Sequence, residues 1–272
     1  MWELKEYLVA GNPAEAVEMM SAGQGKGQFI AGGTDLFLGK PDCDFVVDIS
    51  RAQLSDIART PEGDLFVGAG ATLEQLVADP LVQGFAGGAI SRMASLCANR
   101  PVRSTATVGG NLCNALPSAD MAPVLLALDA TCFVMGHEEQ ESMALADFFV
   151  APRVTVLEGR LLVGLALPGV AAGWRCACRK LTRSAEDISL VQVAVSVGVE
   201  EDTIADLRIA LGAVGPVPLR SNLAENMLVG QKLADVTADL IADAAEIAAG
   251  EAEPITDHRA SAEYRRDMVR VL

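Results

Sequence analysis

Two short segments rich in glycine and in small polar side chains are best suited to bind a ligand. The first is Ile30-Ala-Gly-Gly-Thr-Asp-Leu36, and the second is Thr107-Val-Gly-Gly-Asn111, which Pro117 and Asp120 follow closely. Glycine has no Cβ and tolerates positive φ, so a ligand can approach its backbone closely. Successive exposed N–H groups then form a concave anion site. Together, the two segments predict a site for a long ligand that carries phosphates.

The residue types within the two segments indicate how such a ligand would be held. Residues 32–35 can present backbone N–H groups and a hydroxyl, and residues 109–111 can present similar groups from the opposite side. Asp120 offers a carboxylate that can accept a hydrogen bond from a sugar hydroxyl. The same carboxylate could equally cap the helix expected after it, and the two roles are compatible.

Helices and strands with clear boundaries are expected to position both segments. Asn12 and Pro13 provide an amide N-cap and a proline in the first helical turn. Residues 28–31 are expected to form a short strand that leads directly into the first glycine segment. Thr72 can cap another helix, which Pro80 would end, and residues 99–105 are expected to form a polar loop before the second segment.

The rest of the chain is expected to continue with strands and helices and, after a domain boundary, to form strands followed by helices. Further strands are expected at residues 45–49, 65–69, 131–135 and 161–167, and helices at residues 89–98 and 120–128. A domain boundary is expected at residues 168–173. Beyond it lie three β-rich runs, at residues 174–181, 190–199 and 204–214, followed by helices at residues 222–229, 236–249 and 261–272. Strands followed by helices are typical of an α+β domain.

The composition limits the class of protein and of partner. The chain has 272 residues, of which 51% are hydrophobic and 21% charged, as in a globular protein. Its net charge of -15 would repel a nucleic acid. A small dianionic cofactor remains possible, since backbone amides can hold it without positive side chains. The N-terminus is unlike a signal peptide, and no apolar run approaches the ~18 residues of a membrane span, so a cytoplasmic protein is expected.

The cysteines and histidines do not suggest a metal site. Among the six cysteines only Cys176 and Cys178 are close, and on a strand they would point to the same face. They are interpreted as core thiols, because the chain lacks a Cys-x-x-Cys pair and four well-placed thiolates for an iron–sulfur cluster. His137 and His258 lack metal-ligand spacing. The acidic run at residues 138–141 is expected to be a solvated loop.

Both glycine segments and their spacing resemble the flavin-binding medium subunit of molybdenum hydroxylases, the family of xanthine dehydrogenase and carbon monoxide dehydrogenase. The resemblance spans nearly the whole chain. It implies non-covalently bound FAD and an α+β fold with a two-part FAD-binding domain of the vanillyl-alcohol-oxidase/MurB (PCMH) type at residues 1–168, its subdomains being about 1–52 and 53–168. A C-terminal α+β domain, with a three-stranded antiparallel sheet and helices, would follow at residues 169–272.

The resemblance also implies which residues contact FAD. Those in or near the glycine segments are Ala31, Gly32, Gly33, Thr34, Asp35, Leu36, Ala106, Thr107, Gly110, Asn111, Asn114, Ala119 and Asp120, to which glycine chemistry adds Gly109. Leu162 matches a residue near the flavin ring, Lys180 a lysine near the cofactor, and Asp187-Ile188 a pair on a loop covering the flavin. Taken alone, Leu162 could be a core residue and Lys180 a solvated surface residue. Ala119 departs from relatives with a hydroxyl or glycine there, and the segment 179–187 is slightly shorter than in animal xanthine dehydrogenase.

The function implied by the resemblance is electron transfer within a larger complex. A large subunit would carry the molybdenum cofactor, and a small subunit with [2Fe-2S] clusters would pass electrons to this FAD. The external acceptor would be NAD, a quinone or another carrier, and the expected assembly is a dimer of heterotrimers. Charged residues of the last helix, Tyr264, Arg265, Arg266 and Arg270, would either dock partners or form a solvated face. Two alternatives are a stand-alone flavin-dependent oxidoreductase of the same fold and a flavin-free assembly or interaction protein.

Overall fold

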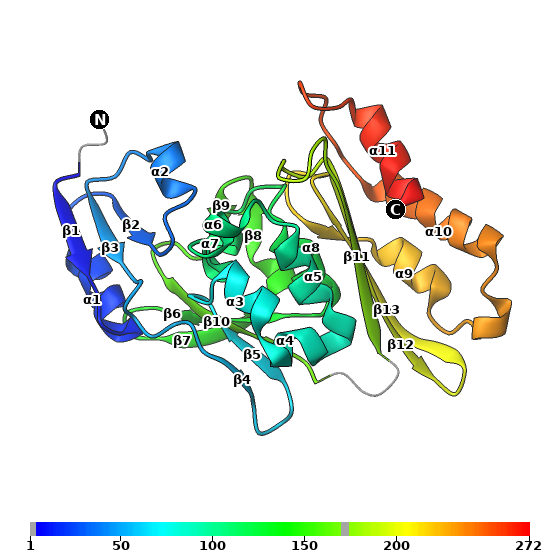
Figure 1. Cartoon of the computed structure of the whole chain (residues 1–272), viewed down its shortest axis with the longest axis horizontal. Coiled ribbons are helices and arrows are strands. Elements are labelled where there is room, and N and C mark those ends of the chain that lie inside the picture. The colour runs from blue at the N-terminus through cyan, green and yellow to red at the C-terminus, as the bar shows by residue number, and fades with distance from the viewer. Residues whose placement is uncertain (1–3, 170–173) are drawn as a thin grey trace.

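The computed structural model describes residues 4–169 and 174–272, and its larger strands form three sheets arranged along the molecule (Figure 1). The N-terminal sheet lies at one end, a five-stranded sheet lies in the middle, and the C-terminal sheet with the last three helices lies at the other end. Of the boundary expected at residues 168–173, residues 170–173 lie outside the described chain. None of the helices described is long and apolar enough to cross a membrane.

The N-terminal sheet is parallel and carries the first glycine segment at its edge. Its order is β1 (Glu6–Val9), β3 (Phe45–Asp48) and β2 (Gly27–Ile30). As predicted, α1 (Pro13–Ala22) begins at Asn12, whose side chain accepts a hydrogen bond of 2.9 Å from the N–H of Glu15. The glycine segment follows the carboxyl end of β2 and leads into the short helix α2 (Leu36–Gly39).

The middle sheet is antiparallel and supports the largest hydrophobic core. Its strands, in order, are β4 (Ile57–Arg59), β5 (Leu65–Gly68), β10 (Leu161–Leu167), β6 (Thr131–Met135) and β7 (Gln140–Ala144). The helices that pack over one face are α3 (Leu73–Ala78), α4 (Pro80–Gly84), α5 (Ala89–Ser95), α6 (Arg100–Arg103), α7 (Val108–Cys113) and α8 (Met121–Ala127) (Figure 1). All seven residues of α8 are buried, as predicted for this apolar stretch.

Three local predictions were wrong in this middle region. The polar loop expected at residues 99–105 contains α6, which begins where Asn99 Oδ1 accepts a 3.1 Å hydrogen bond from Val102 N. The second glycine segment is not a turn but the helix α7, which Thr107 caps. Glycine is a poor helix former, so its presence hid this helix. The acidic run at 138–141 is only partly loop, because Gln140 pairs with Met135 at the start of β7.

The C-terminal sheet packs between two cores. Its antiparallel order is β11 (Arg175–Leu181), β12 (Val191–Glu200), β13 (Thr203–Gly212) and β14 (Leu219–Arg220). One face packs with α9 (Asn222–Leu228), α10 (Ala238–Glu251) and α11 (Ala262–Val271). Cys176 and Cys178 point the opposite way, into the middle core, and so share one face as predicted. The three predicted β runs are confirmed; the fourth strand has only two residues and left no pattern to detect.

A capping box at the start of α3 generates a stability prediction. Thr72 Oγ1 accepts a 3.1 Å hydrogen bond from Gln75 N, and Gln75 Oε1 accepts a 2.8 Å hydrogen bond from Thr72 N. We expect Thr72→Ala to lower the free energy of unfolding by about 1 kcal/mol, because one helix N–H loses its acceptor. Thr72→Ser keeps the acceptor and should cost little. Urea denaturation followed by circular dichroism measures both variants, and equal stability of the two would contradict the assignment.

Candidate functional site

The structure places the first glycine segment directly against residues 105 and 106, which immediately precede the second segment. A Cβ added to Gly32 would lie 1.9 Å from the carbonyl oxygen of Thr105 and 3.1 Å from the Cα of Ala106. Real side chains do not tolerate such distances, so only glycine allows this approach. The two segments therefore lie close together although they are far apart in the sequence.

The first segment presents a run of free backbone donors. Within the described chain, none of the N–H groups of residues 32–36 has a hydrogen-bond partner. Gly33 adopts a φ of +67°, and its carbonyl accepts a 3.0 Å hydrogen bond from Phe37 N as the chain turns into α2. Successive unpaired N–H groups on such a turn form an anion-binding concavity. This is the backbone arrangement that the sequence predicted for this segment.

The second segment does not supply the backbone donors predicted for it. Gly109 N donates to Ala69 O at 2.8 Å, Gly110 N to Thr107 Oγ1 at 3.0 Å, and Asn111 N to Thr107 O at 2.9 Å. The prediction that residues 109–111 offer free N–H groups was therefore wrong. The cause is the helix α7, whose first turn docks against residues 69–71 and uses these donors internally.

The second segment offers instead the amide side chains of two asparagines and the uncovered backbone of one glycine. Asn111 Oδ1 accepts from Met121 N at 3.1 Å, and Asn114 Oδ1 accepts from Arg153 Nη1 at 3.3 Å. Neither amide nitrogen has a partner among the residues described, so both remain available as donors. A Cβ on Gly110 would meet only Thr107 Oγ1, at 2.9 Å, and is otherwise in open space. A Cβ on Gly109 would instead collide with the backbone of Ala69, 2.6 Å away.

Asp120 and Lys180 form a buried ion pair. Lys180 Nζ lies 2.8 Å from Asp120 Oδ2, and the two side chains are 3% and 8% exposed, respectively. Lys180 Nζ also donates to Leu96 O at 3.0 Å. The interpretation of Lys180 as a solvated surface residue was therefore wrong. The interpretation of Asp120 as a helix cap was also wrong, because its side chain makes no capping hydrogen bond to α8.

Two residues that the sequence reasoning missed complete this network. Ser189 Oγ donates to Asp120 Oδ1 at 2.8 Å, and the amide of Gln192 donates to the same oxygen. Gln192 is fully buried in strand β12, between the buried Val191 and Val193. A polar residue at a position between apolar residues was the available signal, since a buried amide needs a partner. The network joins the segment before α8 to the C-terminal sheet.

The thiols near the site are electrostatically unreactive. Burial, followed by the charge of Asp120 and a hydrogen bond to it, raises the pKa of Cys97 to about 12 against the opposing effects of Lys180 and Arg103. Burial likewise raises the pKa of Cys113, Cys132 and Cys176 to about 12. Within residues 4–169 and 174–272, His, Cys, Asp and Glu side chains form no cluster of three suited to a metal ion.

The other predicted site residues lie around this network. Leu162 is 3% exposed on β10 and packs in the middle core, as the core interpretation stated. Ala119 is also buried, next to Asp120. Asp187 and Ile188 lie in the loop between β11 and β12, where Arg183 Nε donates to Asp187 Oδ2 at 2.7 Å. This hydrogen bond lowers the pKa of Asp187 and holds the carboxylate ionised.

Comparisons with known proteins cover both parts of the chain. The FAD binding domain in molybdopterin dehydrogenase matches residues 3–170, and the CO dehydrogenase flavoprotein C-terminal domain matches residues 177–272. The glyceraldehyde dehydrogenase medium chain of Sulfolobus acidocaldarius is 30% identical over 84% of this chain and 80% of its own length. The xanthine dehydrogenase FAD-binding subunit of Escherichia coli O157:H7 is 27% identical over 100% of this chain and 94% of its own.

Solved structures agree with these sequence matches. A chain of the carbon monoxide dehydrogenase from Hydrogenophaga pseudoflava superimposes with a TM-score of 0.92 at 28% identity, over 99% of this chain and 94% of its own. A chain of quinoline 2-oxidoreductase from Pseudomonas putida 86 gives a TM-score of 0.89 at 25% identity, over 100% of this chain and 94% of its own. The similarity therefore extends through both domains.

The buried ion pair predicts strong coupling between its partners. We expect Lys180→Met to lower the free energy of unfolding by about 3 kcal/mol, because it leaves the Asp120 carboxylate buried without its cation. The double variant with Asp120→Asn should recover part of this loss, since neither charge then remains buried. A double-mutant cycle from urea denaturation measures the coupling. Losses that simply add would show that the two side chains do not interact.

The raised thiol pKa values predict slow modification and a loss of stability in alkali. Cys97, Cys113, Cys132 and Cys176 should react with Ellman's reagent at pH 8 at least tenfold more slowly in the folded protein than in urea, because the thiolate is the nucleophile. A thiol whose pKa is raised on folding stabilises the fold fully below the pKa of the unfolded chain. This stabilisation is lost as the pH rises from about 9 towards about 12. Equal labelling rates in the two states would refute the assignment.

Proposed function

Because the chain belongs to the family of FAD-binding domains of molybdopterin dehydrogenases, with the C-terminal domain of CO dehydrogenase flavoproteins, we propose that it binds FAD non-covalently between the two glycine segments. It is the flavoprotein subunit of an oxidoreductase of the xanthine and carbon monoxide dehydrogenase type. We further propose that it transfers electrons within a molybdenum hydroxylase complex, from [2Fe-2S] clusters on a partner subunit to an external acceptor.

The observation that carries the proposal is the run of N–H groups at residues 32–36, which have no partner in the described chain, on a segment whose Gly32 lies against Thr105 and Ala106. A pyrophosphate is a dianion, and backbone donors can bind it without a positive side chain. This suits a chain whose net charge is -15. The amide nitrogens of Asn111 and Asn114 add donors from the second segment. The donor set and the open cradle therefore fit this cofactor.

The proposed contacts fall into three groups by chemistry. Ala31, Gly32, Gly33, Thr34, Asp35 and Leu36 form the backbone cradle. Thr107, Gly110, Asn111 and Asn114 contribute side-chain groups and the open surface, while Gly109 is assigned to packing α7 against Ala69. Apolar contact with the flavin is proposed for Ala106, Ala119 and Leu162. The ion pair of Asp120 and Lys180, whose charges offset each other, is proposed to border the site. When bound, FAD accepts and donates electrons singly or in pairs, and these residues orient it and exclude water.

The partners are proposed from the relatives. The relatives include medium chains of glyceraldehyde dehydrogenase and carbon monoxide dehydrogenase. We propose a large subunit with the molybdenum cofactor, a small [2Fe-2S] subunit, and a dimer of such heterotrimers. NAD, a quinone or another carrier would be the final acceptor. We also propose that the FAD-binding domain ends at residue 168 and that the C-terminal domain begins at residue 169.

The cofactor assignment predicts a yellow protein and defined variants that lose the colour. The purified chain should show a flavin absorption spectrum and release one FAD per chain on heating. Gly33→Val and Gly110→Val should lose most of the FAD while circular dichroism stays that of the wild type. Gly33→Val strains a left-handed backbone position, and Gly110→Val puts a side chain on the open surface, where only the Thr107 hydroxyl must move aside.

Gly84→Val is the matched control, because a Cβ at Gly84 has no neighbour within 4 Å and lies outside the cradle. Full FAD content in both cradle variants would refute the site. A colourless wild-type chain that FAD cannot reconstitute would support the flavin-free alternative. A subunit of a complex should co-elute stably with the molybdenum and iron–sulfur subunits, and its flavin should bleach when the complex receives its substrate. A stand-alone flavoenzyme would show neither result.

A further inference from the structure

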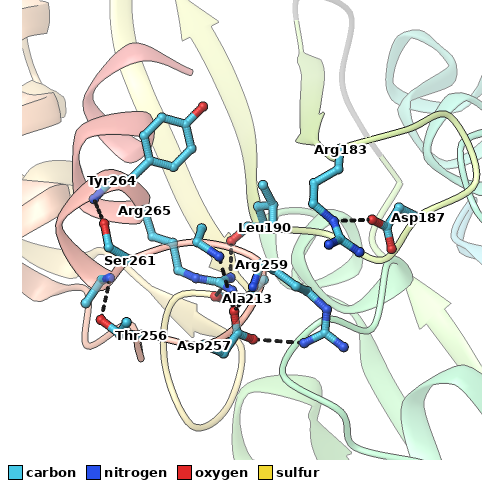
Figure 2. A network of polar contacts seen from close by, with 12 residues as sticks. Arg183, Asp187, Leu190, Ala213, Thr256, Asp257, Arg259, Ser261, Tyr264 and Arg265 are labelled. Atoms are coloured by element: carbon cyan, nitrogen blue, oxygen red, sulfur yellow. Dashed lines mark hydrogen bonds and ion pairs between the residues drawn. The ribbon is translucent and has the colours of Figure 1, made fainter.

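Arg265 is a buried cation that connects the last helix to the neighbourhood of the proposed FAD site. Its side chain lies inside the molecule rather than on the solvated face or docking surface expected for α11, so that expectation was wrong for this residue. Arg265 Nη1 donates to Leu190 O at 2.7 Å and to Ala213 O at 3.3 Å. Arg265 Nη2 donates to Asp257 Oδ1 at 3.0 Å. Figure 2 shows these three contacts converging on one guanidinium.

Asp257 supplies the counter-charge and fixes the position of the arginine. Its carboxylate accepts hydrogen bonds from the backbone N–H groups of Arg259 and Ala260, at 2.9 Å and 3.2 Å. Arg259 Nη1 donates to its second oxygen at 2.8 Å. Burial opposes ionisation of Asp257, but these hydrogen bonds and the one from Arg265 outweigh it and lower the pKa of Asp257 well below its usual range. The carboxylate is therefore ionised and well held.

The two carbonyl groups that Arg265 holds belong to the two loops that bind residues 117–120. Ala213 N donates to Pro117 O at 2.7 Å. Leu190 directly follows Ser189, whose hydroxyl donates to Asp120, and Leu190 N donates to Leu181 O, next to Lys180. One guanidinium thus bonds the backbone at Ala213, which contacts Pro117, and at Leu190, which follows Ser189.

The same cluster also lies beside the loop that carries Asp187 and Ile188. Arg183 interacts electrostatically with Asp257 as well as with Asp187. Asp187 in turn interacts with the positive charge of Arg259. Figure 2 shows the Arg183–Asp187 pair next to the Asp257–Arg259 pair. Two oppositely oriented ion pairs therefore link this loop to the segment before α11.

We propose that Arg265, held by Asp257, is a positioning residue for the FAD site and acts through the backbones of Leu190 and Ala213. It does not touch the cofactor. It fixes where Pro117 and Asp120 lie relative to the two glycine segments, and so controls how tightly and in what environment the flavin is held. This inference rests on the proposed function.

The test uses the full chain with FAD and compares two arginines of the same helix. Arg265→Met should raise the FAD dissociation constant at least tenfold and change the visible circular dichroism of the bound flavin. Arg265→Lys should have an intermediate effect, because its charge remains but one ammonium cannot match the geometry of a guanidinium fork. Arg270→Met is the control, since Arg270 pairs with Glu246 and Asp267 away from these loops. It should leave both flavin properties unchanged.

The outcomes separate positioning from a purely structural role. A lower melting temperature for Arg265→Met, with an unchanged FAD dissociation constant and unchanged flavin circular dichroism, would overturn the inference. If Arg265→Met does not fold, Arg265→Lys and Asp257→Asn are judged by the same two flavin measurements. A wild-type chain that binds no FAD would overturn the proposed function itself, and this inference with it.

Discussion

The buried ion pair between Asp120 and Lys180 is the interaction on which the arrangement of the two domains depends. An ionised carboxylate can leave water only where a cation and hydrogen-bond donors replace its hydration. Lys180 comes from β11, and Ser189 and Gln192 come from the next loop and strand of the same sheet. The C-terminal sheet must therefore pack against the start of α8 in one register. That packing also buries Cys176 and Cys178 against the middle core.

The two glycine pairs look alike in the sequence but do different physical work. Gly32 permits a close backbone contact with Thr105, and Gly33 permits a left-handed turn that leaves successive donors unpaired. Gly109 lets α7 pack on Ala69, and only Gly110 leaves open surface. The proposed phosphate site thus combines one segment's backbone with the other segment's side chains. Under this division, backbone and amide donors would supply the contacts to a dianion in an acidic chain.

Buried cations in this protein organise backbone rather than provide a positive surface. Lys180 and Arg265 are both nearly inaccessible, and each donates to an aspartate and to at least one carbonyl group. Lys180, on β11, bonds Asp120 in the short segment between α7 and α8 directly. Arg265 bonds the loops that contact this segment, at Leu190 O and Ala213 O. The last helix is therefore connected to the proposed cofactor site through two short chains of contacts.

The sequence by itself determined the elements whose signals are local. Asn12 and Thr72 marked two helices, three β-rich runs marked the long C-terminal strands, and the spacing of Cys176 and Cys178 placed them on one face. Only the tertiary structure decided which donors are free: Gly109 N bonds to Ala69 O, which is distant in the sequence, and Gly110 N and Asn111 N bond to Thr107 within a helix that the glycines concealed. It also decided that Lys180 and Arg265 are buried. Their charges suggest the surface, and only partners distant in the sequence offset the cost of burying them.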